Sequence, residues 1–279
     1  MAIDKNTEPR PLFGNAVGST LVTALYARAF GAQMFDVPEW EDPQALQAWQ
    51  ALAPLAAEQG IDLESLVLKE DVNVVGTIRR SQALDSRVCE FVAAHPGAQI
   101  VTLGVGLCNR ASRLADLDAE WVGVDFPAVV DLRRRLLPED ATRLVAGSAT
   151  DRPWLSEIDP TRPAVFVAEG FLMYLDRARV TQLLVRISDR MCAPVRVVAD
   201  MHHSLFVLPT SPITGRTGAD YHFGVSSPQA FAELSPGWSL VGADDTMAPI
   251  KPSSARISRV FALATKGMAF GVVTIENDR

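Results

Sequence analysis

The sequence has few of the residues that build disulfide frameworks or metal clusters. Its 279 residues include three cysteines, Cys89, Cys108 and Cys192, which lie far apart with no CxxC spacing, and only four histidines. Scattered cysteines are typical of a reducing compartment and argue against a structural zinc site. We therefore expect a core held by apolar packing, which a chain of this size can bury in sufficient amount.

Long apolar runs and basic clusters are also scarce. No stretch of about 18 apolar residues occurs, and the first ten residues contain no apolar signal segment. The net charge is −7, and the one basic run, Arg133 to Arg135, is expected to be a solvated helix face. This acidic balance disfavours nucleic acid and anionic membranes as partners. We expect a cytoplasmic protein that acts on a small molecule, and a homodimer is left open as its assembly.

Apolar periodicity divides the chain into a helical first part and an alternating second part. Residues 1–95 predict helices over 19–30, 43–58 and 81–94, which we interpret as an N-terminal helical cap. Residues 96–279 alternate strands with helices and form the core. The expected strands cover 98–103, 121–124, 142–146, 164–168, 195–199, 239–243 and 269–276. Strands that are apolar throughout and alternate with helices indicate an α/β fold with a parallel sheet covered on both faces.

A glycine turn and an acid follow the first two strands. The first strand runs into Gly104 and Gly106, and the helix expected after them would point its amides at a ligand; a plain strand-to-helix turn is the alternative. Asp125 ends the second strand, where a carboxylate can bind the hydroxyls of a ribose. Nicotinamide dinucleotides and S-adenosylmethionine share this feature. A dinucleotide fingerprint needs a third glycine at position 109, where Asn109 stands, so a nicotinamide oxidoreductase is disfavoured.

Further polar residues follow the fourth and fifth strands. Glu169 ends the fourth strand, where it can meet a methionine-like amine; an acid that only satisfies a helix N-terminus is the alternative. His202 and His203 follow the fifth strand, and His222 lies in a long loop expected over 203–224. Adjacent residues on an extended chain point in opposite directions, so the histidine pair does not suit a metal. Substrate contact and ordinary structural hydrogen bonding are both open for these histidines.

Three segments, VTLGVGLCNRASRL, WVGVDFPAVV and VAEGFLMYL, resemble the core motifs of the leucine carboxyl methyltransferase family. With TLVTALYARA and RRSQALDSRV nearer the start, the chain is most similar to the polyketide O-methyltransferases of the tetracenomycin type within that family. The resemblance covers roughly residues 15–276. It implies a class I, Rossmann-like methyltransferase sheet of seven strands with the last strand antiparallel, and S-adenosylmethionine as the cofactor.

The resemblance also implies roles for single residues. Cofactor contacts fall on Gly104 and Gly106 (methionine part), Asp125 (ribose), Arg80 (carboxylate), Glu169 (amine) and Ser148 (adenine). Tyr174, His202 and His203 are the candidate catalytic residues, and Tyr26, Arg28, Tyr174 and His222 are candidates for substrate binding. Two positions depart from the family pattern. Cys108 stands where the family usually has an aspartate, and Ser148 replaces the usual aspartate beside the adenine amine, so weaker cofactor binding is expected.

The implied reaction is methyl transfer to an oxygen of a small secondary metabolite, a carboxylate of an aromatic or polyketide-like acid. A carboxylate is already an anion at neutral pH, so it asks the protein for alignment and not for a base. A phenol acceptor with a histidine base is one alternative. A protein of the same fold that binds the cofactor and cyclises or rearranges a substrate without methyl transfer is another.

Overall fold

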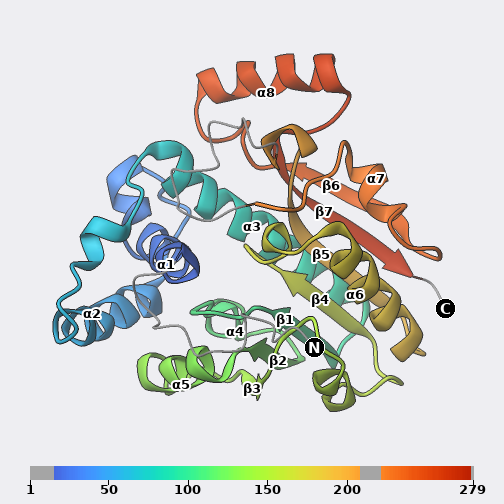
Figure 1. Cartoon of the computed structure of the whole chain (residues 1–279), viewed down its shortest axis with the longest axis horizontal. Coiled ribbons are helices and arrows are strands. Elements are labelled where there is room, and N and C mark those ends of the chain that lie inside the picture. Colours follow the sequence, from blue (N-terminus) through green and yellow to red (C-terminus); the bar gives the residue numbers. More distant parts are fainter. Residues whose placement is uncertain (1–15, 208–220, 278–279) are drawn as a thin grey trace, which may run out of the picture.

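The computed structural model describes residues 16–207 and 221–277, and a single seven-stranded sheet crosses the part that it describes (Figure 1). The strand order is β3-β2-β1-β4-β5-β7-β6. The strands are β1 (Ala98–Leu103), β2 (Ala119–Asp125), β3 (Arg143–Ala146), β4 (Ala164–Ala168), β5 (Val195–His202), β6 (Ser239–Asp245) and β7 (Phe270–Asn277). Strands β1 to β5 pair in parallel, whereas β7 is antiparallel to both β5 and β6. The expected α/β fold with an antiparallel last strand is confirmed.

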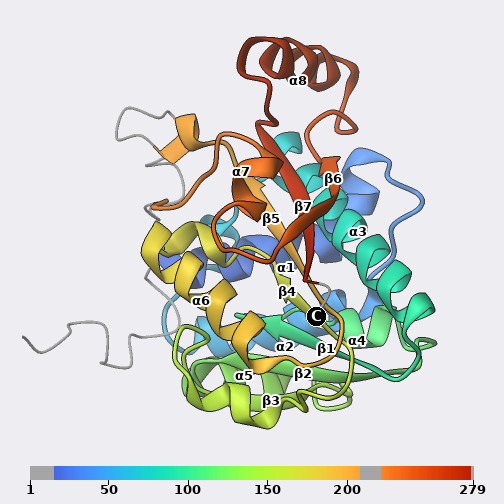
Figure 2. The ribbon, with the colours of Figure 1, turned by 90° about the vertical axis from the view of Figure 1, so that its right-hand side faces the viewer.

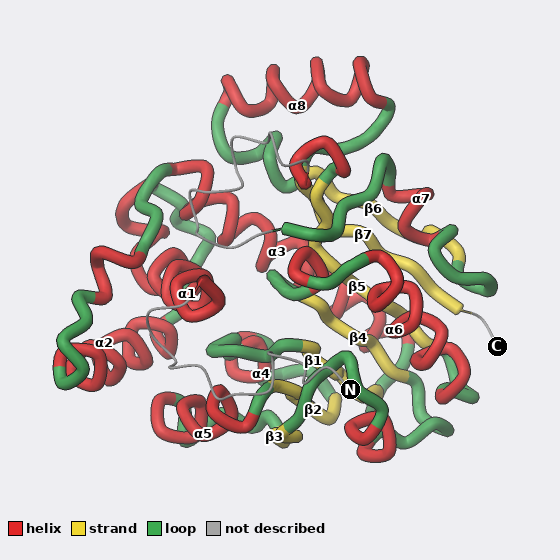
Figure 3. Tube along the Cα trace, in the orientation of Figure 1, coloured by secondary structure: helices red, strands yellow, loops and turns green. Residues whose placement is uncertain are grey.

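The two faces of the sheet are buried because successive side chains of a strand point to opposite sides. In β4, Val165 and Val167 pack with α3 (Asp71–Ala94), while Phe166 and its alternate neighbours pack with α6 (Arg177–Arg190). The short helix α7 (Pro228–Ala232) adds Phe231 to the second face. Figures 2 and 3 show the strands lying between these helices.

Two helices at the start of the chain pack beside the edge where the parallel strands end. These are α1 (Ala16–Phe35) and α2 (Pro43–Ala57), followed by the 3-10 turn η1 (Leu63–Leu66). Asp42 caps α2 by accepting a hydrogen bond from the Ala45 amide at 2.9 Å. Their apolar side chains share a cluster with Leu107 of the glycine loop and with Leu132 and Leu136 of α5 (Pro127–Leu136). The N-terminal helices are therefore joined to the loop that follows β1.

Three expectations about helices are corrected. The helix expected after the glycines, α4, is a single turn, Arg110–Arg113, and too short to direct a set of amides at a ligand. Helix α3 begins at Asp71 and not at Ser81. The expectation of a solvated basic face is wrong for Arg133, which is 1% exposed and pairs with Asp140 at 2.8 Å.

The remaining elements are short, apart from α8 (Pro252–Thr265), the helix that connects the last two strands, β6 and β7. Single 3-10 turns are η2 (Pro153–Glu157), η3 (Leu172–Tyr174) and η4 (Ser204–Val207). Of the loop expected over 203–224, residues 208–220 lie outside the described part of the chain. No helix in the described ranges has both the length and the apolar character needed to cross a bilayer.

Candidate functional site

The register of the parallel strands brings the predicted polar residues to one edge of the sheet. Leu103 of β1 is paired with both Val124 of β2 and Ala168 of β4, and Ala168 is paired with Ala199 of β5. The residues that come next in each strand are Gly104, Asp125, Glu169 and Asp200. They therefore lie side by side at the carboxyl ends of the strands, where ligands bind in open α/β sheets.

The glycine loop needs its glycines for two physical reasons. Gly104 and Gly106 have φ angles of +65° and +49°, a region that residues with a Cβ rarely adopt. A Cβ on Gly104 would lie 2.8 Å from a ring carbon of Phe171. The carbonyl oxygen of Gly106 accepts a hydrogen bond from Arg133 at 3.2 Å, so the buried arginine of α5 holds the loop from behind.

Asp125 is tied to the same loop. One carboxylate oxygen accepts the Gly106 amide at 2.8 Å and the other accepts the Phe126 amide at 2.7 Å. Burial raises the pKa of Asp125 above its usual value, and these two hydrogen bonds offset only part of that rise. Each oxygen keeps a further lone pair, so the carboxylate can still accept hydrogen bonds from a ligand's hydroxyls.

Glu169 lies among positive groups. Its oxygens accept hydrogen bonds from Arg80 Nε at 3.3 Å, Ser81 Oγ at 2.8 Å and Arg110 Nη2 at 2.8 Å. Burial alone would raise the pKa of Glu169, but Arg80 and Arg110 outweigh it and hold that pKa well below its usual range. Its partners are side chains of α3 and α4, so it does not act as a helix N-terminal acid.

Arg80 bridges the ends of two strands. Besides Glu169, it pairs with Asp200 at 3.0 Å, and Asp200 also accepts the Gly170 amide at 3.0 Å. Burial raises the pKa of the Asp200 carboxyl above its usual value; Arg80 opposes this rise only in part, and the nearby Glu169 adds to it. The structure thus places Asp200, two residues before His202, in this ion-pair cluster.

A chain of buried polar contacts runs from this cluster to the N-terminal helices. Arg110 and Arg113 both pair with Asp85 of α3, and Arg113 pairs with Asp42 at 3.3 Å. Asn109 donates to Asp42 and accepts from Arg28 at 2.6 Å and from Arg113 at 2.8 Å. Asn109, at the position of the absent third glycine, is thus a buried junction between α1, the α2 cap and the glycine loop.

Two residues predicted for substrate binding lie inside the N-terminal helical part. Arg28 is buried and donates to the Leu107 carbonyl at 2.7 Å as well as to Asn109. The Tyr26 ring packs against Phe30 and Trp49, with centroids at 4.9 and 5.2 Å. These contacts account for both side chains without a substrate, and their contact with one stays a prediction.

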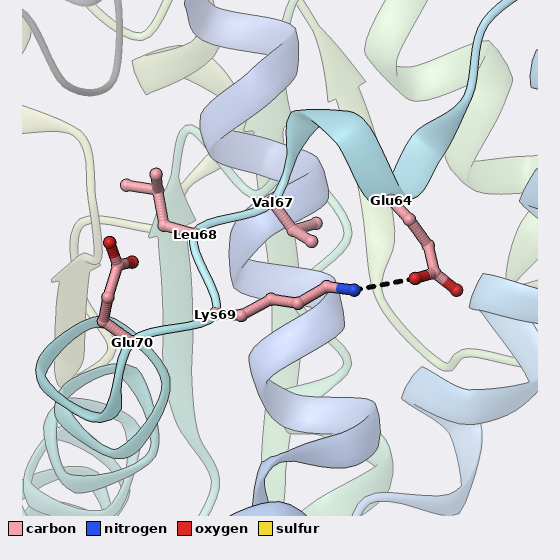
Figure 4. Close-up of a pocket in the computed structure, with 5 residues that line it drawn as sticks. All are labelled: Glu64, Val67, Leu68, Lys69 and Glu70. Atoms are coloured by element: carbon pink, nitrogen blue, oxygen red, sulfur yellow. Dashed lines mark hydrogen bonds and ion pairs between the residues drawn. The ribbon is translucent and has the colours of Figure 1, made fainter.

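A separate hollow of about 560 Å³ lies outside the strand-end site, over the segment between η1 and α3. It is lined by Glu64, Val67, Leu68, Lys69 and Glu70, none of which is a predicted site residue. Figure 4 shows Lys69 and Glu64 facing one another there, in an ion pair of 2.7 Å. The Lys69 ammonium also lies 5.5 Å from the centre of the Tyr26 ring.

The other end of the strand edge is aromatic. The His202 ring lies 5.1 Å from Tyr221 and 5.0 Å from Phe270, and Tyr221 lies 5.8 Å from Tyr174. Burial, with a contribution from Arg80, lowers the pKa of His202 to about 3. Burial and the neighbouring Tyr221 raise the pKa of Tyr174, so its phenol stays neutral at physiological pH. Tyr221 was missed from the sequence, because no spacing links it to His202.

Among the residues that the structure describes, the rings of the other two histidines make no contact with Tyr174, Tyr221 or Phe270. His203 points to the opposite side of β5 from His202, as the alternation of an extended chain requires, and its ring packs 5.0 Å from Phe261 of α8. Its Nδ1 accepts the Leu205 amide at 3.3 Å. His222 is exposed, and its backbone amide donates to Met173 at 2.8 Å. The structure thus brings together Tyr174 and His202 but neither His203 nor His222.

Cys108 and Ser148, the two positions that depart from the family pattern, each make a contact with a nearby side chain. The Cys108 sulfur accepts a hydrogen bond from Arg110 at 3.5 Å, so it occupies the arginine-facing position in place of an acid. The Ser148 hydroxyl lies 2.7 Å from that of Thr150 just beyond β3. Ser148 is therefore at the strand edge, beside the end of β2, and its contact with adenine stays a prediction.

Comparison with known proteins places this site in a family. Residues 44–188 match the leucine carboxyl methyltransferase family, which is more than half of the chain. The tetracenomycin polyketide synthesis O-methyltransferase TcmP of Streptomyces glaucescens is 34% identical over 58% of this chain and 63% of its own length. The S-adenosyl-L-methionine-dependent methyltransferase dpfgK of Gibberella zeae is 30% identical over 61% of this chain and 60% of its own length. The chain thus spans about three fifths of each of these relatives.

A solved structure extends the likeness of fold to almost the whole chain. A protein of Thermobifida fusca, assigned as a methyltransferase, superposes with a TM-score of 0.60 and 18% identity, covering 98% of this chain and all of its own. At that identity the match concerns the fold, and it confirms the class I methyltransferase architecture. With the family match over residues 44–188, the expectation drawn from the sequence motifs is confirmed. The chain belongs to the leucine carboxyl methyltransferase family.

Proposed function

We propose that this chain transfers the methyl group of S-adenosylmethionine to a carboxylate oxygen of a small aromatic acid. The observation that carries the proposal is the single edge at which Asp125, Glu169 and Arg80 adjoin the aromatic group of Tyr174, Tyr221 and His202. Family membership supports the reaction type. The nature of the acceptor rests on the chemistry of the aromatic end.

The charged end has the groups that the cofactor requires. Gly104 and Gly106 would lie against the methionine part of the cofactor, and Gly104 has no room for a Cβ because of the Phe171 ring. Asp125 would accept the ribose hydroxyls, Glu169 the methionine ammonium, and Arg80 would face the methionine carboxylate. Ser148 would meet the adenine. When bound, S-adenosylmethionine would supply an electrophilic methyl group on its sulfonium sulfur, which an oxygen anion would take up while neutral S-adenosylhomocysteine leaves.

The acceptor's ionisation separates the two oxygen chemistries. A carboxylic acid, with a reference pKa near 4, is an anion at neutral pH, whereas a phenol, near 10, must lose a proton before it can attack. His202 is the last residue of β5, and a pKa of about 3 makes it a weak base. Tyr174, whose pKa is raised, serves as a hydrogen-bond donor and not as a phenolate. Aligned transfer to a carboxylate needs neither group as a base.

Paired acceptors test the proposal. Benzoic-type acids and phenols with the same rings are incubated with the protein and S-adenosylmethionine, and products are measured by mass spectrometry from pH 6 to 8. We expect turnover of the acids at a rate that is flat across this range, and little loss in His202→Gln. Turnover of phenols alone, rising with pH and lost in His202→Gln, would establish the hydroxyl alternative.

The departures at Cys108 and Ser148 favour one second candidate, a protein that binds the cofactor without transferring its methyl group. Both positions lose an acid that the family usually has. Restoring the acids in Cys108→Asp and Ser148→Asp separates the two accounts. Methyl transfer by the unaltered chain excludes the second candidate, while cofactor binding with transfer only in the restored variants supports it.

A further inference from the structure

Helix α8 stands apart from the rest of the chain. It follows β6 and precedes β7, and Figures 1 and 2 show it projecting beyond the end of the sheet. Of its fourteen residues, Pro252 to Thr265, only Ser254 and Ser258 are buried. The long helices α2, α3 and α6 each bury a stripe of apolar side chains, so α8 is packed differently from them.

The polar and apolar faces of α8 are reversed relative to those of an ordinary surface helix. The face toward the body carries Ser258, which donates to Asp245, and Phe261, which packs on His203 and stacks 5.6 Å from Phe206. The outward face carries Ile257, Val260 and Leu263, with 56%, 66% and 79% of their surface exposed. A surface helix normally turns its apolar stripe inward.

This reversal leaves α8 short of stabilising contacts. An isolated helix shorter than about 15 residues is marginal in water, and helices in proteins depend on burial of an apolar face. The three outward side chains are spaced i, i+3, i+6 and form a single stripe centred on Val260. Contiguous exposed apolar surface of this kind marks a contact with another molecule.

The charge of the segment that contains α8 indicates what kind of molecule would bind its outward face. Residues 246–275 contain Lys251, Arg256, Arg259 and Lys266 and no acidic residue, a formal charge of +4. Since the whole chain carries −7, the rest of it carries −11. Arg256 and Arg259 make no ion pair with any residue in the described ranges. The segment 246–275, which we call the arm, is thus basic and exposes apolar side chains, whereas the rest of the chain, which we call the body, is acidic.

We propose that α8 is the dimerisation element of this protein and that a second copy of the chain covers its outward face. A second copy is present whenever the chain is made, so it can bury the exposed apolar side chains of α8 at all times. It also offers acidic residues outside 246–275 to Arg256 and Arg259, which make no ion pair within the described ranges. Pairing of identical copies about a twofold axis is the commonest assembly of soluble oligomers. The proposal is independent of the reaction that the site catalyses.

Sedimentation velocity at micromolar concentration tests the assembly. The unaltered protein is expected at about twice the chain mass of 30.2 kDa, and the double variant Val260→Asp/Leu263→Asp at the mass of one chain. The control is Met34→Asp, which alters another exposed apolar residue, on α1, and should stay dimeric. Circular dichroism and calorimetry with S-adenosylhomocysteine should be unchanged in all three proteins.

A second measurement keeps the proposal falsifiable if the double variant fails to fold. Hydrogen exchange of the unaltered protein should protect the α8 amides more strongly as protein concentration rises, while β4 stays unchanged. An unaltered protein of single-chain mass overturns the proposal, also where it sediments with anionic vesicles, which would assign the face to a membrane surface. A double variant that keeps the dimer mass, or α8 exchange that is independent of concentration, overturns it as well.

Discussion

The two ends of the strand edge differ in their side chains: one end is made of ion pairs and the other of aromatic rings. At one end, four arginines and four carboxylates form a largely buried network with no excess charge: Arg28, Arg80, Arg110 and Arg113 with Asp42, Asp85, Glu169 and Asp200. At the other end, Tyr174, Tyr221, His202 and Phe270 pack against one another through their rings. The first end holds charged groups in fixed positions, whereas the second offers the surfaces of aromatic rings.

This difference indicates which end contributes to the stability of the fold and which end to the choice of acceptor. A buried charge that loses its partner is costly, so the charged end tolerates little change. A ring that is replaced costs mainly its own contacts. We therefore expect substitutions at the charged end to affect folding and cofactor binding together, and substitutions at the aromatic end to affect the acceptor.

The largest effect is expected for Glu169→Ala. This change leaves Arg80 and Arg110 with one acidic partner fewer in a buried place, and losses of this kind cost about 3–5 kcal/mol of unfolding free energy. Urea denaturation followed by circular dichroism measures it. Glu169→Gln keeps a hydrogen-bond acceptor and should lose less. A loss below about 1 kcal/mol in Glu169→Ala would show that the network is not held by this carboxylate.

Asp125→Asn should separate binding from stability. Loss of a charged acceptor is expected to weaken S-adenosylhomocysteine binding by about 10- to 100-fold. Because the pKa of Asp125 is raised in the folded chain, its ionisation opposes folding at neutral pH. The asparagine variant removes this opposing ionisation, but its side chain can accept only one of the two backbone hydrogen bonds, so we expect its unfolding free energy to change far less than that of Glu169→Ala. Calorimetry and thermal denaturation measure the two quantities, and unchanged affinity would remove Asp125 from the cofactor site.

Acid should destabilise the protein through His202. Below about pH 6.5 the unfolded chain takes up a proton on this side chain, whereas the folded chain does so only near pH 3. Stability is therefore lost as pH falls through this window, by up to about 2 kcal/mol between pH 6.5 and 5. His202→Asn should flatten this part of the curve, while the exposed His222→Asn should not. Equal curves for His202→Asn and the unaltered chain would mean that His202 is not buried as a neutral ring.

The smallest effect is expected for Tyr221→Leu at the aromatic end. Loss of its ring contacts is worth about 0.5–1.5 kcal/mol, so KM for an aromatic acceptor should rise roughly 3- to 10-fold. Affinity for S-adenosylhomocysteine and unfolding free energy should change much less. Tyr221→Phe keeps the ring and serves as the matched control. If Tyr221→Leu weakens the cofactor and not the acceptor, the division of the edge into two ends is wrong.

The site residues that follow the ends of parallel strands were the ones best predicted from the sequence. Gly104, Asp125 and Glu169 could be placed because parallel strands end at one edge, so residues at equivalent positions meet there. The start of α3 was missed because Gly76 and the β-branched residues around it are poor helix formers. In the structure, Val74 and Ile78 pack beneath α1 at Gly31, and this tertiary contact overrides the weak propensity.

Contacts between distant segments could not be predicted. Asn109 appeared only as a missing glycine, yet it joins Arg28 and Asp42. Arg133 looked like part of a solvated run, but Asp140 and the Gly106 carbonyl satisfy its charge and its donors. Tyr221 reaches His202 from a different segment of the chain. Each of these depends on two elements that come together only in the folded chain.

The most direct test of the proposed reaction is the chemical form of the transferred methyl group. The protein is incubated with S-adenosylmethionine labelled in its methyl group and with a hydroxybenzoic acid, which offers a carboxylate and a phenol on one ring. The account predicts a labelled methyl ester, so mild alkaline hydrolysis should release labelled methanol and return the unlabelled acid. A labelled product that survives hydrolysis is an ether, and it would contradict transfer to the carboxylate.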